Sequence, residues 1–212
     1  FLALTHPDVD HAGGAAAVAR GLQPRQIWLP AGATGWPPRR AITRLRQTAS
    51  ESGIPLVEMT AGEVRCLRGA CVKVLHPPPH APPDASSNER SLVLSISSRG
   101  RRALLAADAG ARTEALLAGR WPRSDYLKVG HHGSRTSSTP GFLDQVRPRI
   151  AIISCGARNR FGHPDRGVVA RLGRFHARVC RTDQHGAIAV ELLAHRRVAT
   201  LVESSCLFAW IG

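Results

Sequence analysis

The sequence predicts an α/β domain in which short apolar strands alternate with helices. Short apolar stretches such as 1–5 and 26–29 are bounded by glycine, proline or polar residues. The segments between them have helical spacing, as in 39–52, where Ile42, Leu45 and Ala49 fall on one face. With 212 residues the chain is long enough for a sizeable core, so we expect residues 1–212 to form one domain.

The predicted elements follow one another along the whole chain. Helices are expected at 15–22, 39–52, 114–117, 142–146 and 168–175. Strands are expected at 1–5, 26–29, 54–59, 71–75, 91–97, 101–107, 126–129, 150–154 and 179–181. The strands at 91–97 and 101–107 flank a Ser-Arg-Gly turn and form a predicted β-hairpin, and 187–193 with 198–203 form a closing one. The proline- and serine-rich segment 77–88 is expected to be a mobile loop.

Polar residues able to bind metal follow several of the predicted strands. His6, Asp108 and His131 each come at or just after the end of an apolar strand, and a polar loop follows Ser154. When several strands of a sheet deliver such groups from one edge, that edge is the expected active site.

The segment Thr5-His6-Pro7-Asp8-Val9-Asp10-His11 holds four potential metal ligands within six residues. On a backbone that is extended and then turns, alternate residues face one way, so His6, Asp8 and Asp10 are expected to converge, with His11 following as the chain turns toward the helix. Imidazole and carboxylate together suit Zn²⁺, Mn²⁺ or iron, and two carboxylates favour harder ions such as Mn²⁺. A solvated polar turn is the alternative, which this density of ligands after an apolar strand disfavours.

Asp108 follows the apolar stretch 103–107. Taken alone, it is best explained as a cap of the helix expected to start near Gly110. Beside a strong metal motif, a carboxylate bridging two ions becomes the better interpretation.

The block Gly130-His131-His132-Gly133-Ser134 is the second strong signal. Adjacent histidines between glycines allow one ring, assigned to His131, to bind metal while His132 faces the substrate. Ser134 and Arg135 supply a hydroxyl and a cation suited to phosphate. The alternative is a polar loop with incidental histidines.

The block 159–164 gives a weaker signal. Asn159 and His163 are suited to holding a leaving group or metal, and Arg160 to holding a phosphate. A loop whose histidine caps or packs against the helix after Pro164 is nearly as good an explanation. Ser134 and Cys155 are poor candidates for a nucleophile because no ordered triad can be inferred around them.

The chain is strongly basic and rich in arginine. Its 29 Lys and Arg against 15 Asp and Glu give a net charge of +14. Arginine pairs well with phosphate oxygens, which points to a polyanion such as nucleic acid, whereas the composition of a high-GC genome would explain the charge equally well. No apolar stretch is long enough to span a membrane.

The five cysteines contain no CxxC pair, which argues against a structural zinc knuckle. Cys66 and Cys71 flank a plausible turn between two strands. They are suited to forming a disulfide in an oxidising compartment, but buried free thiols are an equally good explanation.

Taken together, these motifs resemble the metallo-β-lactamase superfamily, and within it the C-terminal domain of ComEC-like DNA-internalisation competence proteins. The similar blocks occur in the family's order at 5–11 with Gly13-Gly14, 91–94 with Asn88, 104–108, 125–134, 159–164 and 181–183 with Gly186. Two features depart from the superfamily's usual pattern. Asp8 stands at the second histidine of HxHxDH, as is usual in the ComEC-like branch, and the histidine that precedes the bridging aspartate is absent. These departures argue against β-lactam hydrolysis and against strong Zn²⁺ binding.

The resemblance implies an αββα sandwich whose N-terminal strands are missing from this chain, with two divalent ions, Mn²⁺ or Zn²⁺. His6, Asp8 and His131 would surround one ion, Asp10 and His11 the other, and Asp108 would bridge them. Water activated by the ions would attack a phosphodiester. Asp10, His132 and His163 are the expected catalytic residues, and the substrate-binding residues are expected to be Ser134, Arg135, Asn159 and Arg160.

The activity implied is a nuclease that degrades the strand not imported during DNA uptake in natural transformation. The expected partners are DNA, single-stranded in this role, and a membrane channel in the same parent polypeptide. That parent would be an inner (plasma) membrane protein with this domain on the extracytoplasmic, periplasmic side. Two alternatives stay open: a small-molecule phosphodiesterase, and a non-enzymatic DNA-guiding module with a vestigial metal site.

Overall fold

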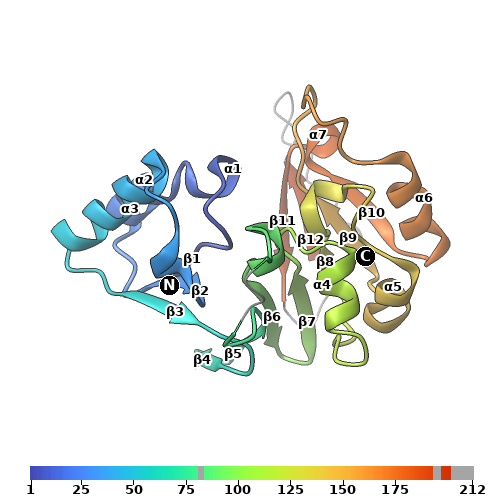
Figure 1. Ribbon diagram of the computed structural model, residues 1–212. Coiled ribbons are helices and arrows are strands. Elements are labelled where there is room, and N and C mark those ends of the chain that lie inside the picture. The colour runs from blue at the N-terminus through green and yellow to red at the C-terminus, as the bar shows by residue number, and fades with distance from the viewer. Residues whose placement is uncertain (81–83, 193–196, 202–212) are drawn as a thin grey trace. The chain divides into compact units, whose positions relative to one another are not determined.

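A computed structural model describes residues 1–80, 84–192 and 197–201 of the chain (Figure 1). Within it the chain forms two compact units. The first consists of Phe1–Glu63 and Lys73–Val93, and the second of Val64–Val72 and Leu94–Gly212. Each unit contains a sheet with helices of its own, and the two are described separately.

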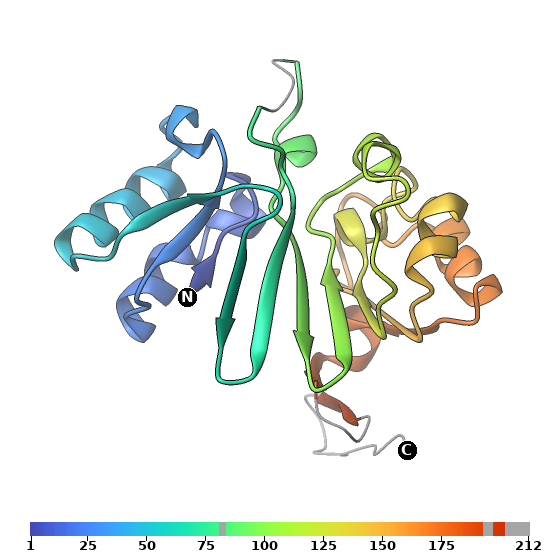
Figure 2. The same ribbon diagram turned by 90° about the horizontal axis from the view of Figure 1, so that it is seen from below.

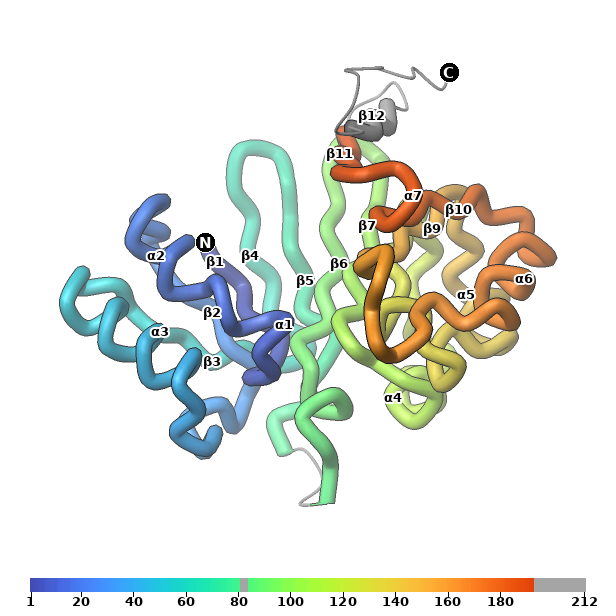
Figure 3. Tube along the Cα trace, turned by 90° about the horizontal axis from the view of Figure 1, so that it is seen from above, coloured from blue at the N-terminus to red at the C-terminus, as the bar shows by residue number. Residues whose placement is uncertain are grey.

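The first unit contains a parallel sheet in the order β1 (Leu2–Ala3), β2 (Ile27–Pro30) and β3 (Leu56–Met59). Parallel neighbours require crossover connections, and the helices α2 (Ala15–Leu22) and α3 (Arg40–Glu51) lie in them. These helices run side by side (Figure 3). Ile42, Leu45 and Ala49 of α3 are buried, which confirms the apolar face predicted for this helix.

The second unit contains most of a seven-stranded sheet in the order β10-β9-β8-β7-β6-β5-β4. The strands are β4 (Val64–Leu67), β5 (Ala70–His76), β6 (Val93–Ser98), β7 (Arg101–Leu105), β8 (Tyr126–Lys128), β9 (Ile150–Ile153) and β10 (Arg178–Arg181). β6 and β7 form the predicted antiparallel hairpin, and β7 through β10 are parallel neighbours. The carboxyl ends of these four parallel strands therefore lie at one edge of the sheet, where polar residues were expected.

Three helices of the second unit are α4 (Ala111–Leu116), α5 (Pro140–Val146) and α6 (Arg166–Arg174), and α5 and α6 lie on one side of the sheet (Figure 2). Each of these two has a defined start. The Thr139 hydroxyl accepts a hydrogen bond from the Phe142 N–H, and Asp165 accepts from Gly167 and Val168, so unpaired N–H groups of the first turn are satisfied. In the described part of the chain, no helix combines the length and apolar character that a bilayer crossing requires.

Most predicted elements are present, with ends that differ by a few residues. The closing hairpin is confirmed as β11 (Ala187–Glu191) paired antiparallel with β12 (Arg197–Leu201), and its predicted residues 193 and 202–203 lie outside the described residues. The prediction did not include β4, the short helices α1 (Val9–Ala12) and α7 (Thr182–His185), or the 3-10 turns η1 (Ala33–Gly35), η2 (Asn88–Arg90) and η3 (Gly130–Gly133). All four residues of β4 are exposed, so no alternation of apolar and polar residues marks it.

A disulfide joins Cys66 of β4 to Cys71 of β5. Of the two alternatives for this pair, the free buried thiols are therefore wrong. Cys155 and Cys180 carry free thiols, and Cys206 lies outside the described residues.

Gly133 is a position where the backbone excludes any side chain. Its φ is +77°, and an added Cβ would lie 2.7 Å from Cβ of Pro164. We expect Gly133→Ala to lower the free energy of unfolding by about 2–3 kcal/mol, because strain and overlap add. Urea unfolding measures the change. Gly141→Ala in α5, where an added Cβ meets nothing within 4 Å, is the matched control and should not destabilise the chain. Equal midpoints for the two variants would contradict the prediction.

Candidate metal centre

In the first unit, Thr5 fixes the two histidines of the first cluster. Its Oγ1 lies 3.0 Å from Nδ1 of His6 and 3.0 Å from Nδ1 of His11. A hydroxyl can donate to one ring nitrogen and accept from the other, so a single side chain orients both imidazoles. The ring centroids are 4.0 Å apart. Metal-binding histidines usually have their second ring nitrogen held by a hydrogen bond, and the Thr5 hydroxyl gives both rings a partner at that position.

The Nε2 atoms of these histidines each face a carboxylate. Nε2 of His6 lies 3.7 Å from Oδ2 of Asp8, and Nε2 of His11 lies 3.8 Å from Oδ2 of Asp10. These distances are longer than hydrogen bonds and close to the separation of about 3.3 Å between two ligand atoms on one tetrahedral ion. The first cluster is therefore arranged as two imidazole–carboxylate pairs.

The turn expected in the first cluster comes before Asp10. The backbone is extended at Asp8, with ψ of 150°, but α1 begins at the next residue. The helical turn places Asp10 beside His11, and its side chain is more than half exposed, whereas His6 is buried. Strand alternation thus accounts for His6 and Asp8 only.

Asp8 has partners besides His6. Its Oδ1 forms an ion pair with the guanidinium of Arg39, and its Oδ2 accepts a hydrogen bond of 3.1 Å from the Ser87 hydroxyl. The carboxylate that stands where the superfamily usually has a histidine is thus held by a cation of the same unit. Asp8 as a metal ligand stays a prediction.

In the second unit, the buried Asp108 and the partly exposed His132 form a pair of the same kind. Asp108 follows β7 and is 3% exposed, and Nε2 of His132 lies 3.7 Å from its Oδ2. Nδ1 of His132 lies 2.8 Å from the carbonyl oxygen of Ser154, just after β9. A carbonyl only accepts, so Nδ1 donates its proton and the Nε2 lone pair faces the carboxylate. That arrangement is repulsive unless a cation or a proton lies between the two groups, so the donor set fits a metal ion.

The alternative role of Asp108 as a helix cap is wrong, because the residue at the start of α4 is Gly110. The backbone beside Asp108 is unusual in another way. Ala107 has a φ of +50°, and His131 and His132 have φ values of +48° and +54°. Left-handed conformations of residues other than glycine cost about 1–3 kcal/mol each and gather at functional sites.

Because His131 and His132 both have a left-handed backbone conformation, their rings lie beside different neighbours. The His131 N–H donates to the carbonyl of Ala107 at 3.0 Å, and the His131 ring centroid lies 5.8 Å from that of His163. The centroids of His131 and His132 are 6.5 Å apart. The structure therefore brings His132 toward Asp108 and His131 toward His163, whereas the sequence assigned the metal to His131.

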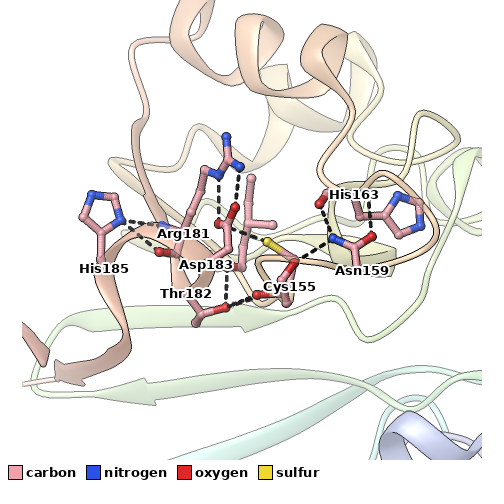
Figure 4. Close-up of polar contacts among 9 residues, drawn as sticks. Cys155, Asn159, His163, Arg181, Thr182, Asp183 and His185 are labelled. Atoms are coloured by element: carbon pink, nitrogen blue, oxygen red, sulfur yellow. Dashed lines mark hydrogen bonds and ion pairs between the residues drawn. The ribbon is translucent and has the colours of Figure 1, made fainter. Parts of the chain in front are cut away.

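Asn159 holds the loop that carries His163 (Figure 4). Its Nδ2 donates to the carbonyls of Gly156 at 2.8 Å and His163 at 2.7 Å, and its Oδ1 accepts from the His163 N–H at 2.9 Å. Burial, followed by the nearby charges of His131 and His132, lowers the pKa of His163 below its ordinary value. A neutral imidazole is thus favoured at His163, and Asn159 positions it.

The other predicted substrate-binding residues differ in exposure. Ser134 is buried, and its hydroxyl lies 3.1 Å from that of Thr136. Arg135 is exposed, and the guanidinium of Arg160 lies 4.9 Å from the ring centroid of Phe161. Arg135 and Arg160 thus have the more accessible charges, and contact of any of these residues with substrate stays a prediction.

Sequence reasoning missed a polar cluster around Cys155 (Figure 4). Its Sγ lies 3.2 Å from Oδ1 of Asp183, which also pairs with the guanidinium of Arg181 at 2.5 Å, and the Thr182 hydroxyl accepts from the Cys155 N–H at 2.8 Å. Burial and the hydrogen bond to Asp183 raise the pKa of the Cys155 thiol to about 11. Such a thiol is a poor nucleophile at neutral pH, in agreement with the interpretation from the sequence.

Cys155 should therefore react slowly with alkylating reagents. With a pKa of about 11, its thiolate fraction at pH 8 is roughly a hundredfold below that of a thiol of ordinary pKa 9.0. Iodoacetamide labelling followed by peptide mass mapping over a pH series measures this. Asp183→Asn should speed labelling, because the nearby negative charge is removed. A labelling curve that reaches its plateau near the ordinary thiol pKa would contradict the prediction.

Comparison with known proteins decides the family. The model described as "Metallo-beta-lactamase superfamily" matches residues 2–157. The chain belongs to the metallo-β-lactamase superfamily. This membership confirms the predicted fold class and superfamily, and the fold is one that holds divalent metal ions.

Two relatives are similar to this superfamily member over most of its length. "ComE operon protein 3" of Bacillus subtilis (strain 168) is 36% identical over 189 residues, 88% of this chain and 24% of the relative. "Recombination protein 2" of Haemophilus influenzae (strain ATCC 51907 / DSM 11121 / KW20 / Rd) is 32% identical over 195 residues, 92% of this chain and 22% of the relative. The chain thus spans about a quarter of the length of these curated relatives.

A solved structure supports the fold independently of close sequence similarity. The metallo-beta-lactamase fold protein YhfI from Bacillus subtilis matches with a TM-score of 0.52 at 10% identity, covering 84% of this chain and 72% of the other.

Proposed function

We propose that the chain is a metal-dependent phosphodiester hydrolase that cleaves single-stranded DNA. The observation that carries the proposal is the pair of the buried Asp108 and the partly exposed His132, in which an imidazole lone pair faces a carboxylate at 3.7 Å. A cation between them resolves the repulsion, and divalent cations in this superfamily serve hydrolysis. The net charge of +14 supports a polyanionic substrate.

The metal ligands are proposed to come from both clusters. The order of the family motifs along the chain is the reason for assigning His6, Asp8, Asp10 and His11 to the same two-ion centre as Asp108. Nitrogen and carboxylate donors of this kind suit Zn²⁺ and Mn²⁺, and the carboxylates favour Mn²⁺. Bound ions would polarise the phosphate and lower the pKa of water.

The second unit supports an exchange of roles between the adjacent histidines. We propose His132 as the ligand, because the Ser154 carbonyl fixes its ring and directs Nε2 toward Asp108. His131, whose ring lies beside that of His163, then faces the substrate. His163 is held by Asn159 and favoured in the neutral form, which suits it to exchanging a proton with the leaving oxygen.

Arginine side chains are proposed to hold the strand. Arg135 and Arg160 flank the histidine loops in sequence, and guanidinium forks pair with phosphate oxygens. Ser134, whose hydroxyl lies beside that of Thr136, is proposed to shape the loop that presents the phosphate.

The biological role proposed is degradation of the non-imported strand during DNA uptake. The similarity to "Competence protein ComA" of Neisseria gonorrhoeae, 36% identical over 104 residues, and to "ComE operon protein 3" supports it. We propose that the parent protein lies in the inner membrane, carries a channel, and places this domain on the extracytoplasmic side. The Cys66–Cys71 disulfide supports that side, since disulfides persist in oxidising compartments.

Incubation of the purified chain with labelled single-stranded DNA and Mn²⁺ tests the proposal, together with metal analysis. Cleavage that Asp10→Ala and His11→Ala abolish supports it, and cleavage that survives both substitutions overturns the metal mechanism. Salt-sensitive DNA binding without cleavage would instead favour a DNA-guiding module. Cleavage of bis-p-nitrophenyl phosphate but not of DNA would favour a small-molecule phosphodiesterase.

A further inference from the structure

An arginine-rich pocket lies in the second unit, apart from the candidate metal residues of that unit. Its volume is about 440 Å³. Five arginines and one aspartate line it together with two serines and a glycine: Arg101, Arg102, Arg123, Arg147, Arg149 and Asp125. The lining side chains therefore carry a net charge of +4, from five positive groups and one negative group.

The pocket lies at the opposite end of the parallel strands from Asp108 and His131. Arg101 is the first residue of β7, Asp125 precedes β8 and Arg149 precedes β9. Asp108 and His131, by contrast, follow the carboxyl ends of β7 and β8. Gly130 is the fifth residue after Asp125, a span of about 16 Å of extended chain. The β6–β7 turn marks the pocket's end of the sheet (Figure 2).

Asp125 lies in one wall of the pocket and neutralises part of the pocket's positive charge. It accepts hydrogen bonds from the Arg101 guanidinium at 2.8 Å and from the Arg102 N–H at 3.1 Å. Burial by itself would raise the pKa of Asp125, but these hydrogen bonds outweigh it and hold the pKa below the ordinary value. The carboxylate therefore stays charged at neutral pH and fixes Arg101.

Two of the remaining arginines also bond to the protein. Arg147 donates to the carboxylate of Asp144 at 3.0 Å, and Arg102 donates to the Arg123 carbonyl at 3.1 Å. Arg123 and Arg149 are exposed, and their guanidinium groups donate no hydrogen bond within the described residues. The pocket thus combines arginines that are held by hydrogen bonds to the protein with two guanidinium groups whose N–H donors bond to no described protein group.

We propose that this pocket is a second nucleic-acid contact, which binds backbone phosphates of the DNA strand that the metal centre cleaves. The lining contains no aromatic ring on which a base would stack, so the pocket fits phosphates and not bases. Binding at both ends of the parallel strands would orient a long strand along the unit. The inference rests on the proposed function for its substrate.

An anionic membrane surface fits the pocket less well than a nucleic-acid strand. Membrane-surface binding combines basic residues with apolar side chains that enter the acyl region. No apolar side chain lines the pocket. The nearest exposed large apolar residues in sequence, Leu116 and Phe161, are not part of the lining.

The test compares Arg123→Glu/Arg149→Glu with Arg166→Glu/Arg174→Glu, two exposed arginines of α6 that give the same change in charge. Binding of a fluorescent oligo-dT of about 20 nucleotides is measured in EDTA, so that cleavage plays no part. The pocket variant should bind at least about tenfold more weakly, with the slope of log K against log[salt] reduced by about 1.4. The control variant should lose less than about threefold.

A loss of affinity that is equal in the two variants overturns the proposal, because scattered charge would then account for binding. Retained oligonucleotide binding combined with lost binding to phosphatidylglycerol vesicles also overturns it, in favour of a lipid surface. With Mn²⁺ present, the pocket variant should show a raised KM for the oligonucleotide and unchanged hydrolysis of bis-p-nitrophenyl phosphate. If the wild-type chain cleaves neither substrate, the proposed function fails, and the binding result in EDTA still decides the pocket.

Discussion

Asp108→Asn should lower metal-dependent cleavage of single-stranded DNA by about 10³-fold or more, which corresponds to about 4 kcal/mol of transition-state stabilisation. The substitution keeps the shape of the side chain but removes the negative charge of a residue that is 3% exposed. A neutral amide facing Nε2 of His132 no longer attracts a divalent cation. The bound metal measured by inductively coupled plasma spectrometry should fall together with the initial rate of cleavage.

The control for Asp108→Asn is Asp144→Asn, another aspartate of the second unit. Its side chain is 66% exposed and pairs with Arg147 on the surface. We expect this variant to retain both metal and activity within about twofold, because a surface ion pair contributes at most about 1 kcal/mol. An Asp108→Asn chain that remains folded, binds metal normally and cleaves DNA at the original rate would exclude Asp108 from the centre.

The second large effect concerns the adjacent histidines. His132→Ala should lose metal and about 10³-fold in activity, because it removes the ring that Ser154 orients toward Asp108. His131→Ala should keep most of its metal and lose about 10²-fold in activity, since its ring lies beside that of His163. Metal content and kcat measured on both variants separate the two roles.

The comparison also tests the assignment made from the sequence. Loss of metal from His131→Ala with metal retained in His132→Ala would restore His131 as the ligand. Because both histidines have positive φ, the matched pair His131→Gly and His132→Gly controls for the backbone. Glycine relieves the left-handed strain, so a loss of metal in the glycine variant cannot be attributed to a distorted turn.

Local patterns in the sequence sufficed for most elements of the fold. The helix predicted at 15–22 has the same bounds in the structure, because a glycine pair precedes it and the left-handed Gln23 ends it. The helix predicted at 39–52 was found from its apolar face, and Ile42 and Leu45 are buried as that face requires. β4 was missed because it buries neither face, so its sequence carries no periodic signal.

The residues of the candidate site could be named from the sequence, but their pairing could not. Asp8 is bonded to Arg39 and Ser87, which lie 31 and 79 residues further along the chain. The orientation of His132 depends on a carbonyl 22 residues away. No local pattern encodes such contacts. The arginine pocket could not be predicted from the sequence for the same reason, because its lining residues come from positions between 97 and 149.

The exposed strand β4 has a consequence for the chain's behaviour in solution. Among the described residues it is the last strand of its sheet, so one side of its backbone is available for pairing with another polypeptide. Its brevity, the charge of Arg65 and the covalent link from Cys66 to the neighbouring strand all oppose such pairing. Reducing agents would therefore break the disulfide and also loosen the edge strand β4 from its neighbour. The loosened edge would promote self-association of the chain.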